Sequence, residues 1–281
     1  QNVMRAFTSL LGVVLFWIVP ILSIPVHHGD DLDLLTASKT CNPNYRVDCL
    51  LGIQDLCEAA GCCWNPATDE NGDKVQGIPW CFYKWEQALG YQASSVSETD
   101  YGYSGALNLY QGTAVYGTDI TPLQFDVFYE TDTRLHIRIS DPNNERWVPP
   151  HVVKTADGTQ KASNPQYKVQ WTNAPFGFSV IRASNNEVLF NSTPTAGGNF
   201  NGLVFENQYL ELSTALPSDS NLYGIGEHIR PLKLTPDTYT LWNLDEGTPE
   251  YKNLYGSHPF YLELRGNSDY SHGVFLVNSN G

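Results

Sequence analysis

Apolar and polar side chains alternate over much of the chain after residue 100. Apolar residues occupy every second position from Leu123 to Tyr129, and residues 134–139 repeat this pattern. Similar short runs lie at residues 167–171, 176–181, 204–212, 238–242, 259–264 and 273–277. Alternation of this kind is typical of strands with one buried face, and Gly, Pro, Asn and Asp clusters separate the runs. The pattern predicts a mainly β fold, an antiparallel β-sandwich over residues 101–281, with a closed barrel as the alternative.

The chain begins with an apolar segment at residues 6–26, preceded by Arg5. A charged residue followed by a short apolar run is the layout of a secretory signal, and the run is also long enough for an uncleaved membrane anchor. Pro20 interrupts the run, and we favour a cleaved signal over residues 1–26. In both cases the rest of the chain faces an oxidising compartment. Residues 27–40 are polar and are interpreted as a linker.

All six cysteines lie between Cys41 and Cys81. In an exported chain, an even set packed this closely predicts a disulfide framework. A zinc site is the alternative, but the segment has no C-x-x-C pair and no nearby histidine, so we expect no metal. The adjacent Cys62 and Cys63 are poor partners for each other, because the small ring would strain the peptide between them. The remaining pairings stay open from spacing alone.

The rest of the composition excludes several functions. The net charge is −14 and there is no Lys/Arg cluster, which argues against nucleic acid and against a membrane surface, apart from a possible N-terminal anchor. Residues 83–100 are interpreted as a second linker, because residues 92–100 are rich in serine and lack periodicity. Gly224 and Gly226 have no third glycine at the spacing of a nucleotide loop, so no cofactor is expected.

The cysteine segment carries three short motifs: R-V-D-C at 46–49, G-C-C-W at 61–64 and P-W-C-F at 79–82. Together they resemble a trefoil (P-type) module over residues 41–82. The resemblance implies three disulfides, namely Cys41–Cys63, Cys49–Cys62 and Cys57–Cys81. It also implies a cleft beside Pro79 and Trp80 where a sugar could stack. We favour the simpler role for Trp80, that of covering the disulfides, because aromatic residues in small stapled modules substitute for a missing core.

Four longer motifs follow, at residues 216–228, 240–245, 253–261 and 272–281. They resemble the N-terminal, galactose mutarotase-like β-sandwich of glycoside hydrolase family 31, in whose α-glucosidases a trefoil directly precedes this domain. The resemblance implies exo-acting, retaining hydrolysis of α-linked glucose by two aspartates on a (β/α)8 barrel. The motif of the nucleophilic aspartate, W-I-D-M-N-E or close to it, is absent from residues 1–281, so we expect no catalytic residue in this portion. The implied partners are an α-glucoside oligosaccharide and the chain's own C-terminal barrel.

One residue of the sandwich reaches the sugar in this family. The motif W-N-L-D at 242–245 resembles the family's W-N-R-D loop, which implies that Asp245 binds substrate. Leu244 stands where arginine is common, which puts the anchoring of the loop in doubt. The alternative is an ordinary turn aspartate before Glu246 and Gly247.

Glu227 and His228 form a second candidate, since Glu and His transfer protons in aldose mutarotases. Adjacent residues on a strand point to opposite faces, so the two converge only if the strand is bulged. We therefore expect a structural role for this pair.

Asn191 begins the only glycosylation sequon of the chain, and Pro194 follows it directly. It fits an exported surface loop, in a protein that is secreted, lysosomal or anchored at the cell surface. A stand-alone secreted carbohydrate-binding protein without catalysis is the alternative to the α-glucosidase.

Overall fold

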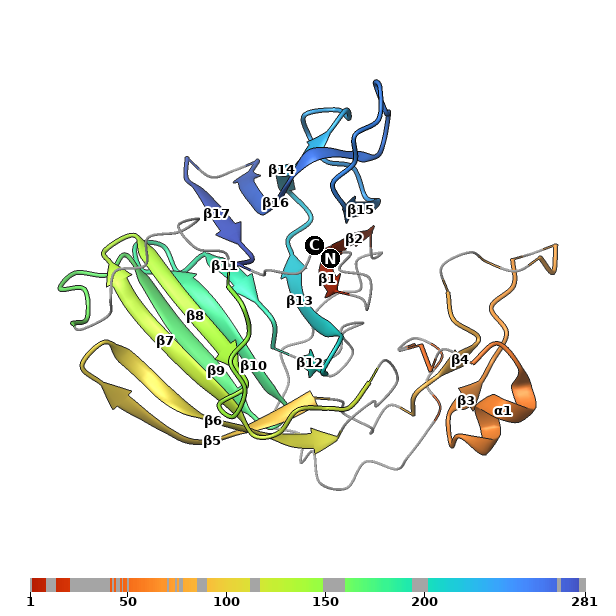
Figure 1. Ribbon diagram of the computed structural model, residues 1–281, viewed down its shortest axis with the longest axis horizontal. Helices are drawn as coiled ribbons and strands as arrows, with labels where there is room; N and C mark the ends of the chain where they lie inside the picture. The colour runs from red at the N-terminus through yellow and green to blue at the C-terminus, as the bar shows by residue number, and fades with distance from the viewer. Residues whose placement is uncertain are drawn as a thin grey trace.

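The computed structural model describes the chain in segments. The described residues are 2–8, 14–20, 41, 43, 46, 48–49, 51–69, 71–73, 75, 78–84, 90–111, 117–148, 160–193, 202–266 and 269–277. A small disulfide-rich region precedes a set of antiparallel sheets, as the sequence predicts (Figure 1).

The disulfide-rich region contains one short helix, α1 (Gln54–Ala59), and a two-stranded ribbon of β3 (Cys63–Trp64) and β4 (Cys81–Phe82). These elements lie to one side of the large sheets in Figure 1. Cysteine sulfurs and a few aromatic rings form its core, in which Cys57 and Phe82 are fully buried. So small a module cannot bury much apolar surface, and the crosslinks take the place of a larger core.

The first large sheet has four strands in chain order: β5 (Gly90–Thr99), β6 (Gly102–Gln111), β7 (Leu123–Thr131) and β8 (Arg134–Ser140). The linker predicted over residues 83–100 is therefore wrong from Gly90 onward. Tyr91 is fully buried, and its hydroxyl donates to two backbone carbonyls. A register shift between Ser94 and Ser97 breaks the alternation of β5, and only its first two residues are buried, which is why its sequence resembles a linker.

A three-stranded sheet packs against the first one. It consists of β9 (Tyr167–Asn173), β10 (Phe176–Arg182) and β11 (Val188–Asn191). The main core lies between the two sheets and is rich in aromatic rings, with the ring centres of Phe125 and Phe176 5.0 Å apart in an edge contact. Such pairs add about 0.5–1.5 kcal/mol to their burial. The facing open sheets correspond to the predicted sandwich, rather than to a closed barrel.

A second three-stranded sheet consists of β14 (Ser220–His228), β16 (Asn253–Arg265) and β17 (Ser271–Phe275). Strand β16 begins six residues before the predicted run at 259–264. The pattern missed this first part because residues 253–258 are mostly polar or glycine and do not alternate with apolar residues. A second apolar cluster lies under this sheet and includes Leu222, Ile225 and Tyr239.

The remaining sheet contains β12 (Val204–Phe205), β13 (Leu210–Leu216) and β15 (Thr238–Leu241). The run predicted at 204–212 is thus two strands, separated by the turn that follows Phe205. Between β13 and β15 lie β1 (Asn2–Thr8) and β2 (Val14–Pro20), drawn in red in Figure 1.

The predicted leader overlaps β1 and β2, while residues 21–40 lie outside the described part of the chain. The leader stays a prediction. Among the residues that the structure describes, no helix has the length and apolar character needed to cross a bilayer.

Candidate functional site

The loop at residues 242–245 follows β15 directly. Leu241, the last residue of β15, is fully buried in the second apolar cluster, whereas Trp242, Asn243 and Asp245 are exposed. The backbone N–H of Leu244 donates to the carbonyl of Leu254 at the start of β16, at 2.8 Å. The loop is therefore anchored through the backbone of Leu244, at the position where the resembling motif has arginine.

A buried amide supports this loop from below. Asn253, the first residue of β16, is 2% exposed, and its Nδ2 lies 3.2 Å from Oδ1 of Asn243 and 3.3 Å from Oγ of Ser257. The hydroxyl of Ser257 also donates to Oδ1 of Asn243. Because a buried donor is costly unless it is hydrogen-bonded, the Nδ2 of Asn253 favours the position of Asn243 that accepts from it.

Asp245 itself is held by a side chain of β16. The hydroxyl of Tyr255 donates to Oδ1 of Asp245 at 2.9 Å. Beside them, Lys252 forms an exposed ion pair with Glu246 at 2.8 Å. The site is thus an exposed carboxylate held by a tyrosine hydroxyl, a combination suited to a polyhydroxylated ligand, since carboxylates accept hydrogen bonds from hydroxyl groups.

Glu227 and His228 do not converge. Strand β14 has register shifts on both sides of Gly226, and Ile225 has a φ of 50°. The carboxylate of Glu227 accepts the backbone N–H of Gly256 at 3.2 Å. The ring of His228 lies instead between the carbonyls of Ile225 and Thr240, at 2.7 and 3.0 Å.

The backbone geometry at residue 224, in the motif that ends with Glu227 and His228, requires a glycine. It has a φ of 110°, and a Cβ atom there would lie 2.5 Å from the carbonyl oxygen of Phe260. His228 lines a shallow pocket of about 180 Å³ together with Arg230 and Tyr239. Glu227 and His228 thus both contact backbone groups, and their structural role stays a prediction.

A buried ion network lies at the other end of the same sheet. Glu263 has no exposed side-chain surface and pairs with Arg265 at 2.7 Å and His272 at 3.2 Å. Burial alone raises the pKa of Glu263, but hydrogen bonds from His272 and Arg265 outweigh it and lower the pKa to about 2. Arg265 also pairs with Glu187, just before β11, which joins the two three-stranded sheets.

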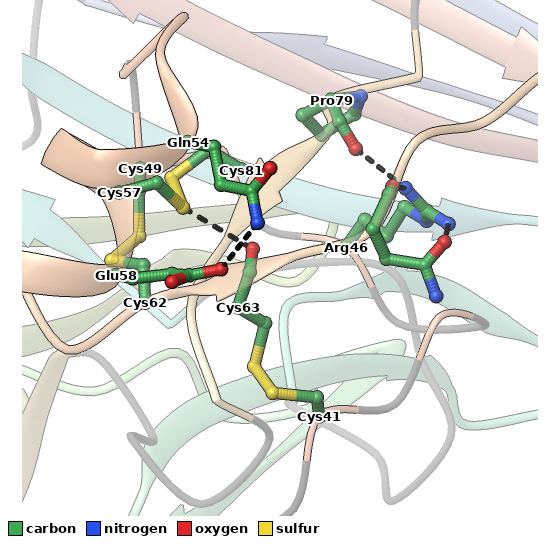
Figure 2. Close-up of a disulfide and its surroundings, with 11 residues drawn as sticks. Cys41, Arg46, Cys49, Gln54, Cys57, Glu58, Cys62, Cys63, Pro79 and Cys81 are labelled. Atoms are coloured by element: carbon green, nitrogen blue, oxygen red, sulfur yellow. Dashed lines mark hydrogen bonds between the residues drawn. A yellow bond between two sulfur atoms is a disulfide. The ribbon is translucent and has the colours of Figure 1, made fainter.

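The disulfide-rich region contains the pairs Cys41–Cys63, Cys49–Cys62 and Cys57–Cys81, the same pairing that the trefoil resemblance implies (Figure 2). Sulfur atoms of Cys49, Cys62 and Cys81 lie within 4.8 Å of one another. All three are in disulfides and carry no thiolate, the form in which cysteine binds zinc, so they do not fit a metal site.

Arg46 connects the strands of this region. Its guanidinium donates to the carbonyls of Pro43 and Asn65 and lies 4.8 Å from the centre of the Phe82 ring. It also donates to the carbonyl of Pro79 (Figure 2). Burial lowers the pKa of Arg46.

The ring of Trp80 is half-buried. It meets Trp64 edge-on at 5.9 Å, and its N–H donates to the carbonyl of Ala67 at 3.1 Å. These contacts favour the covering role for Trp80 over an open sugar platform beside Pro79.

Asn191 lies at the end of β11, at the edge of the described residues. Its Oδ1 accepts hydrogen bonds from the hydroxyl of Ser179 and the N–H of Thr193, both at 2.9 Å. Its use as a glycosylation site stays a prediction.

The supporting residues of β16 were missed by the sequence analysis, which singled out Asp245 alone. Asn253, Tyr255 and Ser257 stand at alternate positions, the spacing of one strand face, and this polar alternation is the signal that could have shown them. Their contacts with the loop depend on which strand lies beside it, and no local pattern gives that.

Comparison with known proteins agrees with this architecture. Residues 115–281 match the glycosyl hydrolase 31 N-terminal galactose mutarotase-like domain, and residues 39–84 match the trefoil (P-type) domain. The chain therefore belongs to glycosyl hydrolase family 31.

Within the family, the chain is 39% identical to lysosomal alpha-glucosidase of Rattus norvegicus over 264 residues, which cover 91% of this chain and 26% of that protein. It is 35% identical to probable maltase-glucoamylase 2 of Homo sapiens over 85% of this chain and 9% of that protein. Alpha-xylosidase 1 of Arabidopsis thaliana is 39% identical over 68% of this chain and 23% of that protein. The chain thus spans about a quarter or less of the length of these relatives.

Proposed function

We propose that this chain is the N-terminal region of an exo-acting, retaining α-glucosidase, and that Asp245 binds the terminal sugar of an α-glucoside. The observation that carries the proposal is the exposed carboxylate of Asp245 on a loop tied to β16 at Asn243, Leu244 and Asp245 itself. A fixed carboxylate accepts hydrogen bonds from sugar hydroxyls without first having to be ordered, which lowers the entropic cost of binding.

The reaction itself belongs to the two aspartates of the family's barrel. In a double displacement, one carboxylate attacks the anomeric carbon while the other protonates the leaving oxygen, and the two groups lie about 5–5.5 Å apart. We propose that residues 101–281 form one wall of the sugar site and pack against that barrel. We also propose that residues 1–26 send the protein into the secretory pathway, where the trefoil disulfides persist.

The test uses the full-length protein with Asp245→Asn, an isosteric change that removes the charge. We expect kcat/KM for glucose release from maltose to fall at least 10-fold, because a hydrogen bond to a charged group contributes about 1.5–3 kcal/mol. Asp269→Asn is the matched control, since Asp269 is an exposed aspartate at the opposite end of β16. Equal activity of the Asp245 variant and the control would refute the proposal.

Two further measurements complete the test. The 281-residue chain alone should release no glucose, and glucose release by it would contradict the proposal that the two catalytic aspartates lie on the barrel. Because an α-xylosidase is among the similar proteins, glucoside and xyloside substrates with the same leaving group should be compared. We expect the glucoside to be preferred.

A further inference from the structure

The hydrogen bond between Tyr255 and Asp245 gives the two oxygens of the carboxylate different roles. We infer that Tyr255 is a positioning residue that holds Oδ1 of Asp245 and directs Oδ2 toward the sugar. The inference rests on the proposed function, because it assigns the orientation of the carboxylate that the sugar meets.

The contacts that order the loop all come from one strand, β16. Tyr255 lies between Asn253 and Ser257 on β16, and these two residues hold Asn243 of the same loop. One short segment of β16, residues 253–257, therefore holds both the base of the loop, at Asn243, and its tip, at Asp245.

Burial also changes along this segment of β16. Asn253 is 2% exposed, whereas Tyr255 is 64% exposed. The buried end fixes the backbone of the loop, while the exposed end contacts the carboxylate where a ligand can reach it. A tyrosine placed only for packing would bury its ring, and Tyr255 does not.

A further support is chemical. A phenol O–H that donates to a carboxylate oxygen restricts rotation of the carboxylate about its last bond. Each carboxylate oxygen has two acceptor sites, so the bond from Tyr255 leaves Oδ2 and the second site of Oδ1 for sugar hydroxyls. Tyr255 thereby orders the group that binds the sugar without contacting the reacting atoms.

The experiment is a double-mutant cycle in the full-length enzyme, with Tyr255→Phe, Asp245→Asn and the double variant assayed on maltose. Tyr255→Phe removes only the hydroxyl. We expect KM to rise roughly 3- to 10-fold with a smaller change in kcat, the effect of losing one partly exposed hydrogen bond to a charged group. In the Asp245→Asn background, the same change should have a much smaller effect, because the amide oxygen that Tyr255 would meet carries no charge and such a hydrogen bond is weaker.

Tyr270→Phe is the matched control, since Tyr270 is also more than half exposed and lies next to β17, away from the loop. It should leave KM unchanged. Thermal unfolding of all variants shows whether a rise in KM reflects a loss of stability. We expect the stability change for Tyr255→Phe to be small, because Tyr255 is exposed.

The outcomes separate the inference from the proposed function. A loss for Asp245→Asn, with Tyr255→Phe equal to the control, overturns the positioning role and leaves the proposed function in place. An equal loss from Tyr255→Phe in both backgrounds overturns the action through Asp245. No loss for Asp245→Asn overturns the proposed function, and the positioning role with it.

Discussion

The carboxylate of Glu263 lies 3.2 Å from the imidazole of His272, the residue directly opposite it on β17. Arg265 meets the same carboxylate at 2.7 Å and continues to Glu187 at 3.2 Å. A fully buried carboxylate is costly unless it is paired and hydrogen-bonded, and here both conditions are met. The network therefore joins the sheet that carries the candidate site to the sheet of the sandwich core.

This network predicts a loss of stability in acid. The pKa of Glu263 is lowered from 4.5 to about 2 by folding, so its contribution is fully present above pH 4.5 and is lost as the pH falls toward 2. The shift corresponds to about 3 kcal/mol of unfolding free energy. Denaturant unfolding of the wild type and Glu263→Gln at several pH values measures it. We expect the variant to be less stable by about 3 kcal/mol at neutral pH, and the difference to shrink below pH 4.5.

Glu246→Gln is the control for this series, because Glu246 forms an exposed ion pair with Lys252. Exposed pairs contribute about 0–1 kcal/mol, so its unfolding curve should follow the wild type. A difference between wild type and Glu263→Gln that stays constant from pH 7 to pH 2 would argue against the charged network.

Gly102 is predicted to tolerate no side chain. It has a φ of 150°, and a Cβ atom there would lie 2.1 Å from the carbonyl oxygen of Val127 on the neighbouring strand. Gly102→Ala should therefore lower the free energy of unfolding by about 2–4 kcal/mol, through strain at the turn between β5 and β6. Gly52→Ala is the control, because its Cβ has no neighbour within 4 Å. Equal melting temperatures for the two variants would contradict the expectation.

The strands that the sequence predicted well are those whose alternation is regular. β7 and β8 place an apolar residue at nearly every second position, and in β7 these apolar residues are all buried except Phe128. β5 could not be predicted, because its serines and its bulge hide the alternation. β14 was also missed, since its glycines and register shifts interrupt the pattern where Ile225 adopts a positive φ.

In the candidate site, too, some residues could be predicted from the sequence and others could not. Asp245 could be proposed from a short motif that resembles a family loop. Tyr255 and Asn253 could not, because their roles depend on contacts between residues ten positions apart on two different elements. The divergence of Glu227 and His228 followed from the geometry of strands, although the bulge that aims Glu227 at Gly256 did not.

The predicted leader can be tested by expressing the chain in eukaryotic cells with its own N-terminus. We expect the protein in the medium to lack residues 1–26 and to contain its six cysteines as disulfides, because export precedes oxidation. Mass spectrometry before and after reduction measures both properties. Secreted protein that retains peptides containing Met4 would contradict cleavage. It would also be consistent with β1 as a permanent partner of β13.

Arg46 is predicted to stabilise the trefoil region in addition to its three disulfides. Its planar guanidinium donates to three carbonyls while stacking on Phe82, a geometry that the single ammonium of lysine cannot reproduce. Arg46→Lys should therefore reduce the stability of the region by about 1–3 kcal/mol, since at least two backbone carbonyls lose their donor. Oxidative refolding followed by proteolysis measures this, and the variant should yield less protease-resistant disulfide-bonded product. Gln54→Ala is the control, because the side chain of Gln54 is exposed and donates to Glu58 one turn further along α1, at 2.8 Å. Equal refolding yields for the two variants would show that the disulfides alone determine the fold of this region.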